Sequence, residues 1–572
     1  MCGIIGYKGE ENAKEKIAEG LKKLEYRGYD SAGAAILANP SIKVEKAEGS
    51  VENLSHNFNG KAGIGHTRWA THGGVNKANA HPHTDTEGKI AVAHNGIIEN
   101  HSELREKLGE EKFESETDTE VIPHLLKKKL SEKKLEKALK ETLSELKGSY
   151  AVTGLIESGE MIAFRKDSPL VIGVKENSFF VASDVMPFLE DTNKAIFLKD
   201  EDYAVIRDGE LKIFNSGKQV NRQIEEIDWD AGQACKNGFE HFMKKEIHEQ
   251  PETVKRAVFQ DRSDIEEASK MIKDAKKVYL TGCGTASYAA MLGAKYLRSQ
   301  GIEAYAEQSH EFEYMASHID KDDLVIAVSQ SGETADLLSA LKKTDCPVLS
   351  VTNVVGSTLA RNSDKTLYIN AGPEIGVAST KAFTAQLTVL KLLSYAVAGE
   401  ISKGRSSLLE TAEKLEEVIK TNERELEKIS DYLLEKDQCF FIGRNKGREL
   451  ASEAALKLKE LSYIHAEAFP GGEFKHGTLS LIEEGVPVFV FMLDDETNSL
   501  SNAVEAYSRG AELIGCGLTR QDVFKYFIQV PEDDNREILE IVPFQILAYE
   551  TSLKKGNNPD KPRNLAKSVT VK

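Results

Sequence analysis

The chain has 572 residues, of which 40% are hydrophobic and 29% are charged. This length predicts about three or four domains, and the apolar content excludes a largely disordered chain. The longest apolar run, Val486–Leu493, has eight residues, whereas a membrane-spanning helix needs about 20. The net charge of −18 argues against a general nucleic-acid-binding surface. We therefore expect neither a membrane nor a nucleic acid as a partner.

The six cysteines lie far apart, at Cys2, Cys235, Cys283, Cys346, Cys439 and Cys516. No pair has the spacing of a zinc site or a redox motif, and their density is too low for a disulfide framework. The N-terminal segment has no basic stretch followed by a long apolar one, so we expect no secretory signal. The sequence predicts a cytoplasmic protein without a metal site.

Residues 1–222 predict one domain in which short strands and helices mix without strict alternation, as in a layered α+β fold. Examples of the expected strands are Gly3–Tyr7, Ala34–Leu37, Ala62–His66, Ile90–His94, Tyr150–Glu157, Leu170–Val174 and Ala204–Arg207. The expected helices are Glu11–Leu24, Asn100–Lys107, Asp118–Lys129 and Lys134–Leu146.

Residues 223–245 are expected to form a linker, because their periodicity is weak until an entry helix over His241–Pro251. A pattern of strand, loop and helix then occurs twice, over 246–405 and over 406–555. Regular βα alternation predicts a doubly wound parallel sheet in each segment, and the repetition predicts tandem copies of one domain. The tail, 556–572, has the composition of a loop but contains apolar residues that could anchor it.

Cys2 is a candidate nucleophile because removal of Met1 would place its thiol beside a free α-amine. Such an amine has a pKa of about 8 and can accept the thiol proton at neutral pH. One residue would thus supply both nucleophile and base. A cysteine that stands at position 2 by chance is the alternative.

Three polar segments follow predicted strands or open a helix in the same domain. Arg68, in the run HTRWATHG, could bind a carboxylate through two hydrogen bonds. The Asn95 amide beside the Gly96 N–H is a suitable pair of oxyanion donors. Asp118 either caps the predicted helix or binds a substrate ammonium group.

Five segments, MCGIIGY, LEYRGYDSAG, HTRWATHG, HNGIIEN and SETDTEV, together resemble the glutaminase domain of class II amidotransferases. The resemblance implies an N-terminal-nucleophile fold, an αββα sandwich, that hydrolyses glutamine and passes on ammonia. It implies a γ-glutamyl thioester on Cys2 and an oxyanion hole formed by Asn95 and Gly96. It also implies that Trp69 gates ammonia passage, and that the glutamine α-groups are held by Arg68, Thr71, His72 and Asp118.

Two loops of the second half have the chemistry of phosphate binding. Residues 329–334 (SQSGET) and 282–285 (GCGT) each connect a predicted buried strand to a helix. Hydroxyls and backbone N–H groups converge there at a helix N-terminus, although Ser and Thr also cap helices routinely. Neither loop has the lysine of a P-loop or a full dinucleotide-binding motif. We therefore expect a phosphorylated small molecule as ligand, and no cofactor.

The predicted helix Gly447–Leu461 carries Glu453, Lys457 and Glu460 on one face, away from its apolar stripe. Surface ion pairs are one interpretation of this spacing. An acid–base set is the other, and the downstream segment 473–477 (EFKHG) favours it.

The second half resembles the isomerase half of the glutamine–fructose-6-phosphate aminotransferase (isomerising) family, which contains two sugar isomerase (SIS) domains. The segments that carry the resemblance include GCGTAS, SQSGETAD, GPEIGVASTKAFTAQL, ALKLKELSYIHAEAF, GGEFKHG and DKPRNLAKSVTV. With the first half, it covers nearly the whole chain and implies two substrates, glutamine and fructose 6-phosphate, with glucosamine 6-phosphate as the product.

The same resemblance implies roles for residues of the second half. Glu460 moves the proton between C1 and C2 of the sugar, and Lys567 forms a Schiff base with the open-chain ketose. His476 assists ring opening and reaches in from the second subunit of a homodimer. The sugar phosphate is bound by Thr285, Ser329, Gln330, Ser331, Thr334, Val377 and Lys457.

The sequence departs from the family pattern at Ala286, where a serine is usual and Ser287 follows instead, and at Thr478, where a proline is usual. Two alternatives stay open: the same chemistry on another ketose phosphate, and a sugar-phosphate-binding regulator with an inactive glutaminase. A phosphoribosyl amidotransferase is disfavoured, because its second half should carry an acidic pyrophosphate-binding motif.

Overall fold

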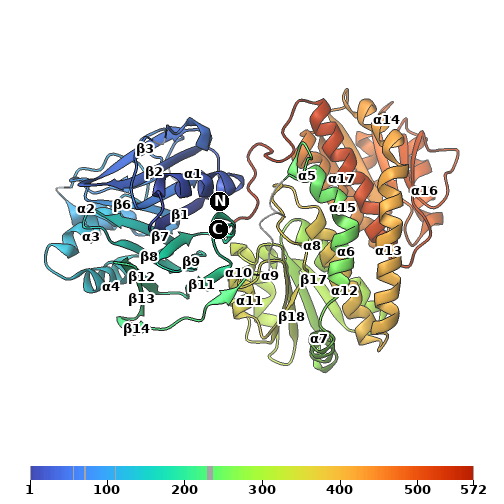
Figure 1. Cartoon of the computed structure of the whole chain (residues 1–572). Helices are drawn as coiled ribbons and strands as arrows, with labels where there is room; N and C mark the ends of the chain where they lie inside the picture. The colour runs from blue at the N-terminus through green and yellow to red at the C-terminus, as the bar shows by residue number, and fades with distance from the viewer. Residues whose placement is uncertain (1, 56, 70–72, 110, 228–235, 571–572) are drawn as a thin grey trace. The chain divides into compact units, whose positions relative to one another are not determined.

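The computed structural model describes the whole chain except residues 1, 56, 70–72, 110, 228–235 and 571–572 (Figure 1). It divides into two compact units. Unit 1 comprises Met1–Ala234 together with Ala566–Lys572, and unit 2 comprises Cys235–Leu565. Each unit is described below by itself.

Unit 1 contains two sheets whose neighbouring strands are all antiparallel. The first has the order β15 (Glu225–Glu226), β11 (Lys194–Phe197), β9 (Val171–Lys175), β10 (Ser178–Ala182), β1 (Gly3–Lys8), β4 (Ala62–Arg68), β2 (Ser31–Ala38) and β3 (Ser41–Glu48). The second has the order β14 (Lys218–Val220), β13 (Glu210–Asn215), β12 (Asp202–Arg207), β8 (Met161–Lys166), β7 (Gly148–Ile156), β6 (Ile90–Ile98) and β5 (His83–Thr84).

Helices cover the outer faces of the two sheets. Helix α1 (Ala13–Leu24) packs on β1 and β4, whereas α3 (Val121–Leu130) and α4 (Leu135–Glu145) contact the second sheet and α2 (His101–Leu108) packs on α3. One apolar cluster, which includes Ile4, Ile64 and Ala93, is buried with members on both sheets. This is the predicted αββα sandwich.

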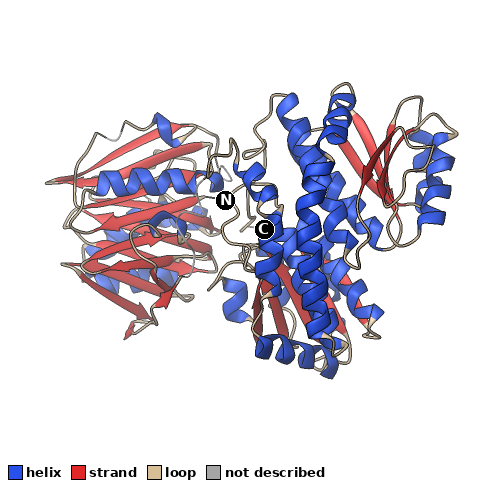
Figure 2. Cartoon of the chain, turned by 45° about the vertical axis from the view of Figure 1, so that its right-hand side comes forward, coloured by secondary structure: helices blue, strands red, loops and turns tan. Residues whose placement is uncertain are grey.

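Unit 2 contains two parallel sheets with the same strand order (Figure 2). The first has the order β17 (Ala304–Gln308), β16 (Val278–Gly282), β18 (Leu324–Ser329), β19 (Val348–Thr352) and β20 (Lys365–Tyr368). The second has the order β22 (His465–Pro470), β21 (Gln438–Gly443), β23 (Pro487–Phe491), β24 (Glu512–Gly517) and β25 (Tyr526–Gln529). The prediction of two tandem doubly wound sheets is confirmed.

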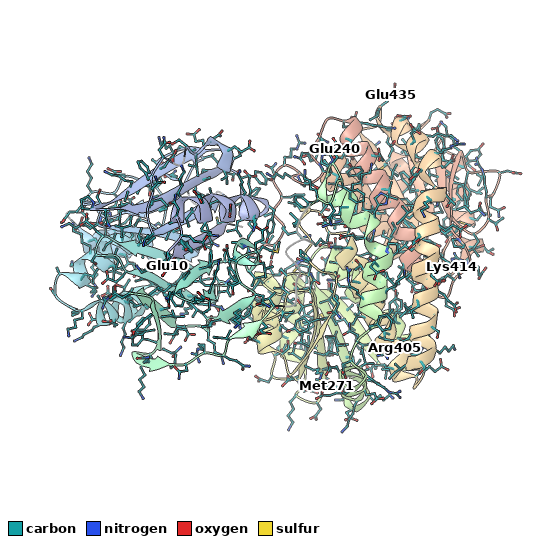
Figure 3. The ribbon with its side chains drawn as sticks, in the orientation of Figure 1. Glu10, Glu240, Met271, Arg405, Lys414 and Glu435 are labelled. Atoms are coloured by element: carbon teal, nitrogen blue, oxygen red, sulfur yellow. The ribbon has the colours of Figure 1, made fainter. Side chains whose placement is uncertain are left out.

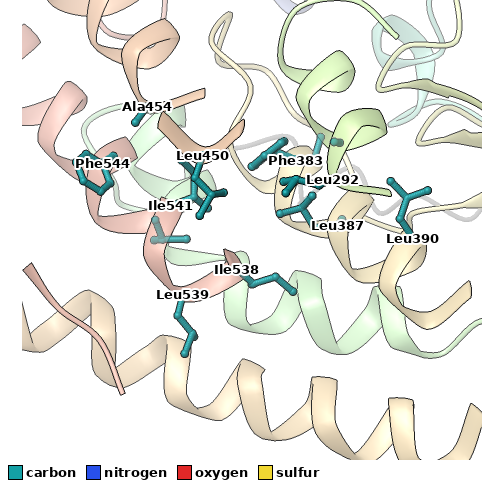
Figure 4. Packing of buried hydrophobic residues seen from close by; sticks show 14 of the residues in the cluster. Leu292, Phe383, Leu387, Leu390, Leu450, Ala454, Ile538, Leu539, Ile541 and Phe544 are labelled. Atoms are coloured by element: carbon teal, nitrogen blue, oxygen red, sulfur yellow. The ribbon is translucent and has the colours of Figure 1, made fainter. Parts of the chain in front are cut away.

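The helices of unit 2 pack against these sheets and against one another. They are α5 (Phe242–His248), α6 (Gln250–Val258), α7 (Arg262–Asp274), α8 (Thr285–Ser299), α9 (Ser309–Met315), α10 (Ala335–Leu341), α11 (Thr358–Asn362), α12 (Lys381–Val397), α13 (Ile401–Thr421), α14 (Glu423–Leu433), α15 (Lys446–Ser462), α16 (Glu496–Tyr507) and α17 (Arg536–Lys554). Figure 4 shows Phe383 and Leu387 of α12 near Leu292 of α8, and Leu450 of α15 near Ile541 of α17. These side chains belong to one buried cluster that spans both copies, so the two copies share a core.

Two of the differences from the expected secondary structure concern the linker and a candidate site residue. Glu225–Glu226, within the expected linker, pairs with β11 and extends the first sheet of unit 1. Helix α3 begins at Val121 rather than at Asp118, because the Asp118 carboxylate accepts a hydrogen bond from the Ile98 N–H at 2.6 Å. Asp118 is therefore not the cap of this helix.

Charged side chains cover the exterior, as Glu10, Glu240 and Glu435 illustrate in Figure 3, where each is exposed. In the described parts of the chain, no helix is both long enough and apolar enough to cross a bilayer.

Candidate active sites

The first candidate site lies at the start of β1, where Cys2 immediately precedes the strand. Side chains alternate along a strand, so Cys2 shares the face of Ile4, which packs between the two sheets. Gly3 faces the other way, where a β-carbon would lie 2.6 Å from Thr67 Oγ1 and 2.7 Å from Leu24 Cβ. The close packing at Gly3 fixes the backbone that carries the thiol.

The Cys2 sulfur is held by the backbone of Trp69, which follows β4. The Trp69 N–H donates to Sγ at 3.2 Å, and the thiol lies 3.4 Å from the Trp69 carbonyl oxygen. Burial raises the pKa of the Cys2 thiol, while the chain-terminal ammonium, the Trp69 N–H and Arg68 act in the opposite direction. The thiol is thus placed as a nucleophile that needs a base to become a thiolate.

Asn95 and Gly96 lie on β6, in the sheet opposite Cys2. The Asn95 side chain donates from Nδ2 to the Cys2 carbonyl oxygen at 2.9 Å. Gly96 has a φ of +121°, and a β-carbon there would lie 2.0 Å from the Ser149 carbonyl oxygen. Only glycine fits this position, so the pairing with β7 fixes the backbone that presents the Asn95 amide to Cys2.

His66 is a residue of this site to which the sequence analysis gave no role. Its Nε2 lies 3.1 Å from Asn95 Oδ1 and 3.0 Å from the His94 carbonyl oxygen. Both partners are acceptors, so Nε2 carries the proton. Burial lowers the His66 pKa to about 3, and the neutral ring orients the Asn95 amide with Nδ2 toward Cys2. In the sequence, His66 stands two residues before Arg68 on a predicted strand, and residues two apart on a strand share a face. This spacing was the signal that could have placed His66 at the same site.

Arg68 and Asp118 are both buried at this site. The Arg68 guanidinium donates to the carbonyl oxygens of Gly73 and Gly74, each at 3.2 Å. Burial lowers the Arg68 pKa, and the charges of Cys2, Asp30 and Asp118 oppose this shift. Arg68 thus acts electrostatically on the Cys2 thiol, and the Asp118 carboxylate is near enough to Arg68 to influence its pKa. Thr71 and His72 lie outside the described residues.

Trp69, the expected ammonia gate, is half-buried and packs edge-on against Tyr29. The two ring centroids are 5.6 Å apart, with an interplanar angle of 81°. The indole is therefore held by an aromatic neighbour, and the backbone of the same residue contacts the Cys2 sulfur.

The second candidate site lies in unit 2, at the carboxyl ends of β16 and β18. The strands are parallel, but β17 lies on one side of β16 and β18 lies on the other. The point where the order of strands reverses in this way is where ligands bind in this class of fold. The loops after both strands were predicted to bind phosphate, and the topology places them at the same edge.

The loop after β18 is held in shape by its own hydroxyls. The Gly332 N–H donates to Ser329 Oγ at 3.0 Å, and Ser329 Oγ lies 3.4 Å from Thr334 Oγ1. Gly332 has a φ of +65°, and a β-carbon there would lie 2.2 Å from Ser357 Oγ. The glycine thus allows the tight turn between Gln330, Ser331 and Thr334.

The loop after β16 leads into α8, whose first residue is Thr285. Ser287, which follows the unusual Ala286, is buried, and its hydroxyl donates to the Gly284 carbonyl oxygen at 2.6 Å. This hydroxyl therefore holds the loop itself, so Ser287 does not replace the missing serine by a shift of one residue.

Helix α15 supplies the charged group of this site. Lys457 is 1% exposed, and its Nζ lies 3.0 Å from Thr285 Oγ1, 2.7 Å from Glu460 and 3.5 Å from Glu453. Burial by itself lowers the Lys457 pKa, but Glu453 and Glu460 together raise it. This burial excludes the interpretation of the three residues as surface ion pairs.

Glu453 is fully buried, and Thr285 Oγ1 donates to its Oε1 at 3.2 Å. Its Oε2 has no hydrogen-bond partner among the described residues. Burial raises the Glu453 pKa to about 8, against the lowering by Lys457. At neutral pH most of this carboxyl is protonated, so a neutral acid lies beside the Lys457 ammonium.

The remaining predicted residues lie at different places. Val377 is buried, and its N–H donates to the Asp560 carbonyl oxygen at 3.2 Å. His476 is exposed, and its side chain makes no hydrogen bond or ion pair within the described part of the chain. Lys567 is half-buried in the segment 566–572, which groups with unit 1. The described residues contain no group of three or more side chains suited to a metal ion.

Known proteins resemble this chain along its full length. A glutamine–fructose-6-phosphate aminotransferase (isomerizing) from Thermococcus kodakarensis is 43% identical over 605 residues, with 100% of both chains covered. One from Clostridium acetobutylicum is 42% identical over 611 residues, again with 100% of both covered. The chain belongs to the glutamine–fructose-6-phosphate aminotransferase family.

Domain comparisons agree with this family. The family model of the glutamine amidotransferase domain matches residues 66–190, and that of the SIS domain matches residues 271–396 and 432–522. The C-terminal domain of glucosamine-fructose-6-phosphate aminotransferase from Francisella tularensis superposes with a TM-score of 0.54 at 32% identity, covering 57% of this chain and 99% of that one. The amidotransferase match includes Arg68, Asn95, Gly96 and Asp118 of the first candidate site but begins after Cys2, and the two SIS matches include the loops after β16 and β18 and helix α15.

The buried carboxyl of Glu453 makes a prediction about stability and pH. Because folding raises the Glu453 pKa from about 4.5 to about 8, the folded chain holds a proton that the unfolded chain loses. The stability that this group contributes is present below about pH 4.5 and is lost as the pH rises through 8, by at most about 1.4 kcal/mol per pH unit. As the pH rises over this range, the melting temperature of a Glu453→Gln variant should therefore increase relative to that of the unmodified protein.

Calorimetry at several pH values between about 5 and 8 measures this difference. A Glu435→Gln variant, which removes an exposed carboxylate from the same unit, controls for the loss of one charge. A Glu453→Gln difference that stays constant across the range would contradict a protonated, buried Glu453.

Proposed function

We propose that this chain transfers the amide nitrogen of glutamine to fructose 6-phosphate and isomerises the product to glucosamine 6-phosphate. The observation that carries the proposal is the full-length similarity to enzymes of that name, which includes both candidate sites. Such an enzyme supplies the precursor of hexosamines and their nucleotide sugars. The sites described above suit the two half-reactions.

In the first half-reaction, the Cys2 sulfur attacks the side-chain carbonyl carbon of glutamine. A C–S bond forms, and the carbonyl oxygen becomes an oxyanion stabilised by Asn95 Nδ2 and the Gly96 N–H. The α-amine, freed by removal of Met1, accepts the thiol proton and returns it to the leaving nitrogen. The C–N bond then breaks and releases ammonia, and water hydrolyses the thioester to glutamate.

The glutamine α-groups have opposite charges, and so do the residues proposed to bind them. Arg68 binds the α-carboxylate, Asp118 binds the α-ammonium group, and Thr71 and His72 complete the site. Trp69, beside the Cys2 sulfur, gates the departure of ammonia.

Ammonia must stay uncharged to act on the sugar. In water at neutral pH it is mostly protonated, and ammonium has no lone pair with which to attack a carbonyl. We infer that the nitrogen passes within the protein from Cys2 to the sugar without mixing with bulk solvent.

In the second half-reaction, the loop after β18 binds the phosphate of fructose 6-phosphate through Ser329, Gln330, Ser331 and Thr334. Thr285, Val377 and Lys457 line the sugar. His476 of a second copy assists ring opening, so we propose that the protein acts as a homodimer.

The Lys567 amine then adds to the C2 carbonyl of the open-chain ketose, and water leaves as the imine forms. Ammonia adds to C2 of this imine, and the Lys567 amine departs. Glu460 removes the proton from C1 and delivers it to C2, while the imine nitrogen gains a proton and the C1 hydroxyl loses one, which converts the 2-imino sugar into the 2-amino aldose. The Lys457 ammonium stabilises the negative charge that develops on oxygen.

This assignment divides the chain into functional parts. We propose a glutaminase domain over 1–222, a linker over 223–245, SIS domains over 246–405 and 406–555, and a catalytic tail over 556–572. The intact Cys2, Glu460, His476 and Lys567 disfavour a regulator with an inactive glutaminase.

The substrate assignment is tested by product identification. The purified protein given glutamine and fructose 6-phosphate should produce glucosamine 6-phosphate and glutamate in equal amounts, detected by mass spectrometry. Another ketose phosphate, supplied in parallel, should turn over more slowly. Absence of an amino sugar with folded protein would contradict the assignment, and faster turnover of the other ketose would redirect it.

Two variants separate the half-reactions. Cys2→Ala removes the nucleophile, so glutamine hydrolysis should fall to background while fructose 6-phosphate still isomerises to an aldose phosphate. Lys567→Ala should lose amination by a factor of about 100 or more and still hydrolyse glutamine. Rates of glutamate and sugar phosphate formation measure both effects. Full sugar turnover by Lys567→Ala would show that the tail assignment is wrong.

A further inference from the structure

The tail between α17 and Lys567 has no helix or strand, yet its residues 557–563 are held at defined points of unit 2. Asp560 is at the centre of these contacts and is 7% exposed. Its carboxylate accepts hydrogen bonds from the Phe242 N–H at 2.9 Å and from the Met243 N–H at 2.8 Å. Both donors belong to α5, the first helix of unit 2.

The backbone of Asp560 makes a further contact with the sugar-site loop. Its carbonyl oxygen accepts from the Val377 N–H at 3.2 Å. The same loop is held from the other side by Glu246 of α5, which accepts from the Ile375 N–H at 2.5 Å and the Gly376 N–H at 3.2 Å. Asp560 thus joins three segments at one point: α5, the loop around Val377 and the tail.

A second set of contacts ties the tail to the end of α15, the helix that carries Lys457 and Glu460. Asn557 Nδ2 donates to the Leu461 carbonyl oxygen at 3.0 Å, and the Arg563 N–H donates to the Tyr463 hydroxyl at 2.8 Å. The Arg563 guanidinium also lies 4.0 Å from the centre of the Tyr463 ring. The tail therefore spans two elements that line the candidate sugar site.

We propose that Asp560 is a positioning residue that anchors the tail and so delivers the Lys567 amine to the ketose. The inference rests on the proposed role of Lys567. Lys567 follows Arg563 by four residues and therefore lies within about 14 Å of it, whereas a tail free from the end of α17 would let it range over about 45 Å. Anchoring raises the effective concentration of the amine at the sugar, as a short linker does for a tethered ligand.

The charge of Asp560 suits this role. A carboxylate that accepts two backbone N–H groups makes stronger hydrogen bonds than a neutral side chain, and burial keeps water from competing for them. The tail is thus held by hydrogen bonds from one carboxyl group to the first turn of α5.

The test compares four variants of the full-length chain: Asp560→Ala, Tyr463→Phe, Lys567→Ala and Asp261→Ala. Tyr463→Phe removes the hydroxyl that accepts from Arg563 and keeps the ring. Asp261 accepts from the Ser263 N–H at 2.8 Å where α7 begins, so Asp261→Ala removes a comparable hydrogen bond from the same unit without touching the tail.

Each variant is assayed for amination, for glutamine hydrolysis without sugar, and for reductive trapping. In trapping, borohydride supplies hydride to the imine carbon and leaves a stable secondary amine between fructose 6-phosphate and Lys567, quantified by peptide mass spectrometry.

Asp560→Ala should lower the kcat of amination by about tenfold or more, with a parallel loss of trapped adduct, because fewer tails present the amine. Glutamine hydrolysis and the KM for the sugar should stay within about twofold. Tyr463→Phe should show a smaller loss of the same kind, and Asp261→Ala should match the unmodified protein.

Wild-type amination and trapping by Asp560→Ala would overturn the proposal, as would an equal loss of all activities in Asp560→Ala and Asp261→Ala. If Lys567→Ala also keeps full amination, the failure lies instead in the proposed role of Lys567.

Discussion

The first candidate site depends on one strand register. Gly3 of β1 pairs with Thr67 of β4, which puts the preceding Cys2 against the backbone of Trp69 and leaves its side chain between the two sheets. A shift by one residue would turn the thiol toward the opposite face. The tight contacts at Gly3 and Gly96, where an added β-carbon would collide with neighbouring atoms, oppose such a shift. The reactive group is therefore positioned by sheet packing rather than by a mobile loop, and the neutral His66 fixes the amide that faces it.

In unit 2, the candidate site residues are positioned by the packing of two copies of one fold against each other. The first copy supplies the switch point between β16 and β18, and the second supplies α15 with its buried Lys457. A buried ammonium group is stable only with close partners, and Glu453, Glu460 and Thr285 provide them. Since the Lys457 amine contacts Thr285 of the other copy, the copies must pack together for the charge to be satisfied. The second candidate site thus needs residues from both copies of the fold.

The sequence predicted the architecture because both units follow regular patterns. Strict βα alternation in unit 2 and short apolar segments separated by turns in unit 1 are readable without tertiary information, and the order of five motifs led to the prediction that Cys2 is the nucleophile. Other features depend on tertiary contacts that no local pattern encodes. Asp118 was expected to open a helix, yet its carboxylate bonds to Ile98 on a strand 20 residues earlier in the chain. The burial of Glu453 depends on the packing of α15 against α8, so the sequence could not distinguish it from an ordinary surface glutamate. The role of His66 depends on contacts with the opposite sheet, so the sequence could not distinguish it from an ordinary core histidine.

The central claim is that one polypeptide releases nitrogen at a buried thiol and uses it at a sugar without exposing it to water. In the most direct measurement, the protein receives glutamine labelled with ¹⁵N at the amide, fructose 6-phosphate and an excess of unlabelled ammonium. Mass spectrometry then determines the ¹⁵N content of the glucosamine 6-phosphate. The account predicts that the product carries the label almost completely, whatever the concentration of ammonium outside. A product whose label falls in proportion to the added ammonium would contradict it.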